Sequence, residues 1–411
     1  MTELGAIRVL DASLNRASEG LRVVEDYVRF VLDDRHLTEQ FKRLRHDLAA
    51  AGSTLPLAER HAARETQADV GTTVSTPSEG TRGDAWGVCV ASLGRVKQSL
   101  RSLEEFSKVA KPRAAGEFER LRYWLYTLEG ALGRTVDGVE RLGAARLYVL
   151  IDGCGSEAAL VRLVKELLAA RVDVIQLRDK GLSDRELLSR ARLLVAICRS
   201  MANEAEPMKH LPVPSPRRGG LGRGESSSYQ ASAPLPSPPL QGEGAGAEEW
   251  YKPLANESAS EPVTETCLPL VIINDRPDIA AVVDADGVHL GQDELSVKDA
   301  RTIVGPRRLI GVSTHSIEQA RAAVLDGANY LGVGPTFPSQ TKSFATFPGL
   351  EFVRQVAAEI RLPAFAIGGI TLQNIGEVIE AGLQRVAVAS AVTGAAKPQA
   401  AAEALREAFD L

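Results

Sequence analysis

The sequence predicts an α/β protein built on a closed (β/α)8 barrel and preceded by an all-α N-terminal region. From residue 147 onward, eight short runs rich in Val, Ile and Leu alternate with amphipathic helical stretches. Parallel strands covered on both faces read as continuous apolar runs, as these do. Eight evenly sized units with polar ends favour a TIM barrel, and a doubly wound open sheet is the alternative. The runs are LYVLID, VDVIQLR, PLVIIND, DGVHLG, LIGVST, YLGVGP, PAFAIGG and RVAVAS.

Residues 1–140 are predicted to form a helical N-terminal domain. The segment ASLNRASEGLRVVEDYVRFVL has apolar residues at the spacing of one helical face, and GEFERLRYWLYTLEGAL is a further helix. The pattern of apolar and charged residues in the first segment recurs in SLGRVKQSLRSLEEFSKV. This recurrence indicates either an internal duplication or two helices that pack in the same way. At one constant offset, Leu14, Arg16, Leu21, Arg22, Glu25 and Tyr27 correspond to Leu93, Arg95, Leu100, Arg101, Glu104 and Phe106.

A polar stretch rich in Gly, Ser and Thr, RETQADVGTTVSTPSEGTRGD, is expected to be a long loop within this helical domain. Loops of such length in compact domains often carry function. Its charged residues Arg64, Asp69 and Arg82 are therefore candidates for a functional role.

The barrel is predicted to occupy residues 144–411, with an insert at 201–266. The insert is dense in Pro, Gly and Ser, as in PVPSPRRGGLGRGESSS, and has too few apolar anchors to offset its ordering entropy, so we expect it to be disordered. It falls between the second helix and the third strand. Such a connection lies on the amino-terminal face of a barrel, away from the chemistry, and we assign it no function.

Composition excludes several classes of protein. The chain has 411 residues and a net charge of −5, without the basic excess of a nucleic-acid-binding protein. Neither a secretory signal nor an apolar run of membrane-spanning length is present, so a cytoplasmic location without membrane association is expected. Four scattered cysteines, without a CxxC pair or a histidine at zinc spacing, are interpreted as reduced structural thiols.

The second strand of the predicted barrel ends in a basic tip. Alternation places Gln176, Arg178 and Lys180 on one side of the strand. Two cations beside an amide suit a polyanion, because an arginine binds phosphate oxygens in a fork and a lysine adds a point charge. The alternative is a surface salt-bridge cluster with Asp179 and Asp184.

Oxygen ligands follow the next two strands. Asn274 and Asp275 end the third strand, and Asp293 and Glu294 follow the fourth. Carboxylates at neighbouring strand ends suit Mg²⁺, which completes its shell with water and substrate phosphate. Alternatively, Asp275 and Asp293 cap the helices that follow. The fifth strand ends in a segment that contains Ser313, and His315, near a helix start, is interpreted as structural.

A second anion site is predicted at the last strands. Gly369 ends the seventh strand, and the eighth ends in Ala389 and Ser390, which matches the recurrent phosphate site of barrels. The sixth strand leads into GVGPTFPSQTKSF, residues 332–344, where hydroxyls, backbone N–H groups and one ammonium suit a phosphate or pyrophosphate.

Residues 144–411, without the insert, resemble thiamine phosphate synthase. The matching motifs are QLRDKG, IIND, DGVHLGQDE, GVSTH, GVGPTFPSQTK, AIGGIT and VASAV, in family order. The resemblance implies a transferase of thiamine biosynthesis that joins 4-amino-5-hydroxymethyl-2-methylpyrimidine diphosphate to a thiazole phosphate. Its products are thiamine phosphate and pyrophosphate, and its metal is Mg²⁺.

The resemblance also implies the roles of single residues. By the resemblance, the pyrimidine and its diphosphate bind to Gln176, Arg178 and Lys180, with Asn274 and Ser313 nearby. Lys342 contacts the leaving diphosphate. Mg²⁺ goes to Asp275 and to the acidic residue after the Gly-Gln pair, and the catalytic groups are Arg178, Lys180, Ser313 and Lys342. The thiazole phosphate is expected at Ser339, Thr341, Gly369, Ala389 and Ser390.

This chain departs from the family pattern at the second metal ligand. The family usually has Asp at the fourth position of GQxD, where this chain has Glu294, with Asp293 one residue earlier. Either the longer Glu294 or a shifted Asp293 completes the metal site.

The N-terminal region resembles the helical domain fused to some members of the family, which has been proposed to replace a pyrimidine phosphate kinase. No P-loop or Gly-rich kinase motif is present in it.

Three other functions were weighed for this fold. They are a thiazole tautomerase-like paralogue, a non-catalytic sensor of thiamine precursors, and a barrel isomerase that acts on a sugar phosphate. The isomerase would leave the basic and acidic strand ends unexplained.

Overall fold

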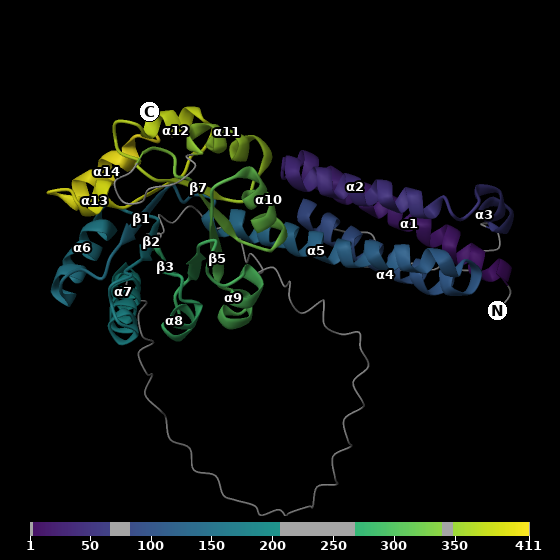
Figure 1. Ribbon diagram of the computed structural model, residues 1–411, viewed down its shortest axis with the longest axis horizontal. Helices are drawn as coiled ribbons and strands as arrows, with labels where there is room; N and C mark the ends of the chain where they lie inside the picture. The colour runs from purple at the N-terminus through teal and green to yellow at the C-terminus, as the bar shows by residue number, and fades with distance from the viewer. Residues whose placement is uncertain (1–2, 66–82, 206–267, 339–347, 411) are drawn as a thin grey trace, which may run out of the picture. The chain divides into compact units, whose positions relative to one another are not determined.

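The structure is a computed structural model that describes residues 3–65, 83–205, 268–338 and 348–410 (Figure 1). The described residues up to Met201 and from 268 onward belong to one compact unit. This unit holds a helical N-terminal region and a barrel. The predicted boundaries at 140 and 144 fall near the end of α5, which spans Pro112–Leu142, and the start of the first strand at Leu147.

The predicted eight strands all form, and they close into one parallel barrel in sequence order. The closing pair joins the first and last strands, with Tyr148 opposite Ala387. The open-sheet alternative is therefore wrong. The strands are β1 (Leu147–Ile151), β2 (Val174–Leu177), β3 (Leu270–Asn274), β4 (Gly287–Leu290), β5 (Leu309–Thr314), β6 (Tyr330–Val333), β7 (Ala364–Ile367) and β8 (Val386–Val388).

The strands are mainly apolar because their two faces bury different cores. Inside the barrel, Tyr148, Ile272, Tyr330 and Phe365 belong to one compact cluster of buried side chains. The outward-facing side chains pack instead against the surrounding helices, which cover the barrel in Figure 1. These are α6 (Glu157–Ala169), α7 (Asp184–Ala205), α8 (Pro277–Val282), α9 (Val297–Val304), α10 (Ile317–Leu325), α11 (Gly349–Glu359), α12 (Ile375–Glu380), α13 (Ser390–Thr393) and α14 (Pro398–Glu407).

The N-terminal region is helical, as predicted, and consists of long amphipathic helices with a shared apolar core. Side-chain caps fix two helix starts: Asp34 accepts a hydrogen bond from the Leu37 N–H, and Asp84 accepts one from Gly87. The bounds are α1 (Glu3–Phe30), α2 (Arg35–Gly52), α3 (Leu57–Ala63), α4 (Ala85–Ala110) and α5 (Pro112–Leu142). The sequence analysis did not identify α2 or α3 as individual helices.

The repeat between α1 and α4 extends to their buried charges. Glu25 of α1 accepts hydrogen bonds from Arg22, three residues earlier, and from Arg45 of α2. Its counterpart Glu104 accepts from Arg101, again three residues earlier, and from Arg122 of α5. Each glutamate is therefore bound by one arginine of its own helix and one of the next helix along the chain.

The insert separates α7 from β3, as the order of apolar runs predicted. Its first residues, 201–205, form the end of α7, and the others, like Asp69 and Arg82 of the expected N-terminal loop, lie outside the described ranges. Over those ranges, no helix is long and apolar enough to cross a membrane.

Candidate active site

Two amide side chains meet where β2 and β3 end. Gln176 is almost fully buried, and its Nε2 donates to Oδ1 of Asn274 at 3.4 Å. The strands pair in parallel with Gln176 opposite Ile272, which brings their carboxyl ends to the same rim of the barrel. The two amides therefore present hydrogen-bond donors and acceptors at the mouth, as the sequence predicted for this pair of strands.

One ammonium group joins the two predicted acidic positions. Nζ of Lys180 lies 3.2 Å from Oδ2 of Asp275 and 3.8 Å from Oε1 of Glu294. Asp275 follows β3 and Glu294 follows β4, so carboxylates from two connections converge on one cation. Asp293 is exposed and forms no ion pair with any residue that the structure describes.

Local backbone geometry accounts for this convergence. Asp275 has a left-handed φ of 59°, which aspartate tolerates better than most residues, and its N–H donates to the His289 carbonyl at 2.8 Å. Glu294 folds back over Gly291: a Cβ on that glycine would lie 2.2 Å from Oε2 of Glu294. The Glu294 side chain therefore points toward Asp275, because Gly291 has no side chain that would block it.

The capping interpretation of the two aspartates is wrong. Arg276 is the residue before α8, and no side chain caps that helix, whereas the hydroxyl of Ser296 caps α9. Neither Asp275 nor Asp293 is therefore needed to start the helix that follows it.

The salt-bridge interpretation of the basic tip is also wrong. Asp184 pairs with Arg276, and Asp179 accepts three backbone N–H groups instead of binding Arg178 or Lys180. Burial raises the pKa of the Asp179 carboxyl, but these three bonds outweigh burial and hold the pKa below its usual value. Within the described ranges Arg178 has no ion pair, so its guanidinium is available at the mouth.

A chain of hydrogen bonds leads from the barrel interior to Ser313. The hydroxyls of Tyr148 and Tyr330 lie 3.1 Å apart, and that of Tyr330 lies 3.2 Å from Nδ1 of His289. Nε2 of His289 then lies 2.9 Å from Oγ of Ser313. Tyr330 fits because Gly311 faces it on β5, where a Cβ would lie 2.0 Å from its ring.

The donor and acceptor roles in this series of hydrogen bonds follow from its buried end, at Tyr148. Burial lowers the pKa of His289 to about 4, so the ring is neutral and only one of its nitrogens donates. If Nδ1 donated, both tyrosine hydroxyls would point inward and the hydrogen of Tyr148 would have no acceptor. A buried unsatisfied donor is costly, so Tyr330 donates to Nδ1 and Nε2 donates to Ser313. The Ser313 hydrogen is then directed away from His289.

Sequence analysis missed His289, Tyr330 and Tyr148, because each belongs to an apolar run that was attributed wholly to the core. A signal was present in DGVHLG, where a histidine occupies an otherwise apolar strand. His315, which was interpreted as structural, binds the Gly334 carbonyl through Nδ1 at 2.6 Å.

The predicted second anion site lies partly in the described structure. Gly368 and Gly369 both have positive φ, and a Cβ on either would lie within 2.9 Å of the chain that follows β6, so the turn requires two glycines. Ala389 and Ser390 lie at the start of α13, exposed. Ser339, Thr341 and Lys342 fall outside the described ranges.

Polar groups gathered at the carboxyl ends of β2 to β5 of a (β/α)8 barrel mark an enzyme, since barrel active sites lie at this rim. Comparison with known proteins identifies the kind of enzyme. A family model described as "Thiamine monophosphate synthase" matches residues 147–205 and 252–392, and one described as "ThiD2 family" matches residues 8–131.

Full-length relatives agree with these matches. A thiamine-phosphate synthase of Rhodopirellula baltica is 40% identical over 396 residues, covering 94% of this chain and 88% of the relative. One from Synechocystis sp. is 34% identical over 402 residues, covering 97% and 95%. A solved structure of thiamine phosphate pyrophosphorylase from Pyrococcus furiosus aligns at 28% identity with a TM-score of 0.44, over 64% of this chain and 95% of that one.

The chain belongs to the thiamine-phosphate synthase family and is a transferase of thiamine biosynthesis. The resemblance found in its motifs is thereby confirmed. These comparisons favour the synthase over the tautomerase, sensor and isomerase alternatives.

Proposed function

We propose that the mouth of the barrel joins the pyrimidine diphosphate to thiazole phosphate, releasing pyrophosphate, with the residues described above. The observation that supports this most is the convergence of Lys180, Asp275 and Glu294 beside the amides of Gln176 and Asn274. A phosphate-only site at the last two strands would need neither this basic tip nor these carboxylates.

The amides hold the pyrimidine ring, which offers nitrogen acceptors and an amino donor, and Arg178 with Lys180 binds the diphosphate. Arg178 binds as a fork and Lys180 as a point charge. Lys342 adds a third positive charge at the leaving diphosphate.

Mg²⁺ fits the carboxylates that Lys180 now joins. Asp275 and Glu294 already point toward a single cation, and Mg²⁺ takes one or two carboxylates together with water and substrate phosphate. Among the described residues there is no group of three or more His, Cys, Asp or Glu side chains that could hold a metal. In this proposal, water and substrate oxygens complete the shell. When bound, the ion would neutralise negative charge on the diphosphate.

In the reaction, the bond from the exocyclic methylene carbon to the diphosphate oxygen breaks, and its electron pair leaves with the diphosphate. The pyrimidine amino group donates electron density into the ring and stabilises the cation that remains. Arg178, Lys180 and Lys342 stabilise the charge growing on the leaving group, which is preorganised electrostatic catalysis. The thiazole nitrogen then donates its lone pair to the same carbon. That nitrogen carries no proton, so no general base is required.

Ser313 contributes a hydroxyl donor of fixed direction. Because His289 donates to its oxygen, the serine hydrogen is directed to the pyrimidine or its diphosphate. The side chain of Gln292 donates to the Ser313 carbonyl at 2.6 Å and holds the backbone at this point. His289 is thus a positioning residue in this proposal.

The thiazole phosphate is held at the opposite side of the mouth. Gly369, Ala389 and Ser390 supply backbone and hydroxyl donors there, together with Ser339 and Thr341. Anchoring this phosphate raises the effective concentration of the thiazole nitrogen at the methylene carbon.

The test is pyrophosphate release by the full chain, with both precursors and Mg²⁺, in wild type, Arg178→Ala and Arg192→Ala. Arg192 is an exposed arginine of α7 and serves as the matched control. We expect release that requires both precursors, falls at least about a hundredfold in Arg178→Ala, as for loss of one preorganised donor, and persists in the control. Folded wild-type protein without release would contradict the proposal and favour the sensor.

A further inference from the structure

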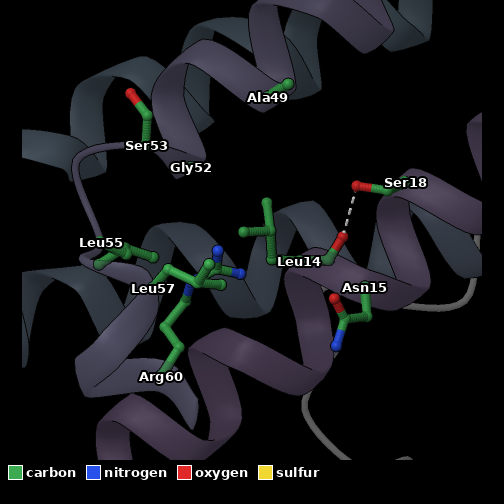
Figure 2. Close-up of a pocket in the computed structure, with 9 residues that line it drawn as sticks. All are labelled: Leu14, Asn15, Ser18, Ala49, Gly52, Ser53, Leu55, Leu57 and Arg60. Atoms are coloured by element: carbon green, nitrogen blue, oxygen red, sulfur yellow. Dashed lines mark hydrogen bonds between the residues drawn. The ribbon is translucent and has the colours of Figure 1, made fainter.

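The helical N-terminal region contains a hollow that the barrel chemistry does not use. It lies between α1, the end of α2 and the start of α3, and its volume is about 430 Å³ (Figure 2). Leu14 and Leu55 give it an apolar wall, and Asn15, Ser18, Ser53 and Arg60 bring polar groups to it. Small-molecule sites have volumes of roughly 300–1,000 Å³ and this mixture of linings, so the hollow is large enough for a small ligand.

Arg60 is the least satisfied polar side chain of this hollow. It shares the buried carboxylate of Asp11 with Arg64, but Arg64 makes both short bonds, at 2.7 and 2.9 Å. Among the described residues, Arg60 makes one contact with Asp11 at 3.4 Å, and its buried Nε has no hydrogen-bond partner. Within those residues, two guanidinium groups share one carboxylate, which leaves a net positive charge in this cluster. An anionic ligand in the hollow would bind the accessible part of the Arg60 guanidinium and balance this charge.

The helix end beside Arg60 does not oppose an anion. A helix C-terminus normally presents free carbonyls and partial negative charge. Here the carbonyls of Ala49, Ala50, Ala51 and Gly52 all accept hydrogen bonds from the turn that follows, through Ser53, Thr54 and Leu55. The partial charges that would repel a ligand anion are thus already paired.

The repeat between α1 and α4 separates residues that pack the helical bundle from polar residues that the bundle does not require. Positions that pack the bundle are alike in both copies, including Leu14 with Leu93 and Glu25 with Glu104. The polar positions at the hollow differ. Asp11, Asn15 and Ser18 of α1 correspond to Val90, Gly94 and Lys97 of α4, and Lys97 pairs with Glu129. The bundle fold therefore does not need this polar set, which occurs only beside the hollow.

We propose that this hollow binds a small organic anion, with its phosphate or carboxylate on Arg60 and its apolar part against Leu14 and Leu55. The amide of Asn15 supplies a further donor and acceptor. The hydroxyls of Ser18 and Ser53 donate to carbonyls of their own helices and remain able to accept from the ligand. The site is separate from the barrel mouth and does not depend on the function proposed for it.

The test uses phenyl phosphate as probe and a thiol introduced at the rim as reporter, in the full chain. In the Ser53→Cys variant, alkylation of the introduced thiol is followed by peptide mass spectrometry, which separates it from the native cysteines. We expect phenyl phosphate to slow this alkylation several-fold, and phenol at the same concentration to leave the rate unchanged. Adding Arg60→Gln should weaken protection about tenfold, the loss expected for one charge-assisted hydrogen bond.

Two further variants separate a binding site from a structural role of Arg60. Arg35→Gln removes an equal charge from an exposed arginine of α2, and protection should persist. Asn15→Leu leaves Asp11 and both of its arginines in place, and protection should weaken. Unchanged alkylation in the presence of phenyl phosphate, or equal protection with and without Arg60 in protein that melts normally, would overturn the proposal.

Discussion

Nε2 of His289 lies 2.9 Å from the hydroxyl of Ser313, at the inner edge of the barrel mouth. The ring is buried and neutral, so its tautomer determines whether the serine oxygen accepts or donates at this contact. A buried tyrosine pair therefore controls the direction of a hydroxyl at the predicted substrate site. This relationship yields the first prediction.

Tyr330→Phe should lower kcat about tenfold while the KM for the pyrimidine diphosphate changes little. The variant removes the donor to Nδ1 of His289, so the tautomer that donates to Ser313 is no longer favoured, at a cost of about one hydrogen bond. Steady-state kinetics of pyrophosphate release measures both constants.

Tyr148→Phe is the matched control for this variant. Tyr148 is equally buried, but its hydroxyl lies at the inner end of the chain and reaches His289 only through Tyr330. We expect near-normal kcat here, because without the Tyr148 oxygen the Tyr330 hydrogen still has Nδ1 of His289 as its acceptor and the direction is kept. Equal losses in the two variants would contradict the direction that we assign to the chain.

Glu294→Gln should raise the Mg²⁺ concentration needed for half-maximal activity by at least about tenfold, a loss that even substitution of an outer-sphere group can cause. Glu294 faces Asp275 across Lys180, and the absent side chain at Gly291 leaves room for it. Asp293→Asn, with the same change of charge one residue earlier, should leave the requirement unchanged. The reverse order of effects would assign the metal to Asp293.

Alkaline stability should depend on Cys198 of α7. Burial raises the pKa of its thiol to about 12, with Asp286 adding to the effect, against an ordinary value of 9.0. The unfolded chain therefore loses this proton first as pH rises. The thiol contributes stability that is fully present below pH 9 and is lost as pH rises toward 12, amounting to roughly 1.4 kcal/mol between pH 8 and 10.

Urea unfolding under reducing conditions at pH 8 and pH 10 tests this dependence. Cys198→Ala should lose less stability over that interval than wild type, by about the amount given above. Ser200→Ala, an exposed and non-titrating position on the same helix, should behave as wild type does. An unchanged pH dependence in Cys198→Ala would show that the folded thiol titrates normally.

The barrel could be predicted from sequence because each strand is a continuous apolar run, and this pattern depends only on burial of both faces. The polar ends at Gln176, Asn274 and Asp275 could also be predicted, because the carboxyl ends of parallel strands lie at one rim of the barrel. The position of Glu294, and not Asp293, beside Lys180 could not, because it depends on the backbone turn at Gly291. The chain from Tyr148 to Ser313 could not either, since it joins four strands through side chains that alternation alone assigns to the core.

The helical repeat gives the last prediction, which concerns Glu104 and its neighbour Glu105. Glu104 is almost fully buried between Arg101 and Arg122, and the Arg122 side chain is only 9% exposed. Glu104→Ala would leave that guanidinium buried without its carboxylate, which typically costs about 3 kcal/mol of unfolding free energy. Glu105 pairs with Arg101 and Lys108 on the surface, so Glu105→Ala should cost within about 0.5 kcal/mol. Urea unfolding compares the two variants.

Glu25→Ala should resemble Glu104→Ala, because Glu25 occupies the corresponding place in the first copy. Similar small losses at residues 104 and 105 would mean that the buried pairs do not hold the bundle together.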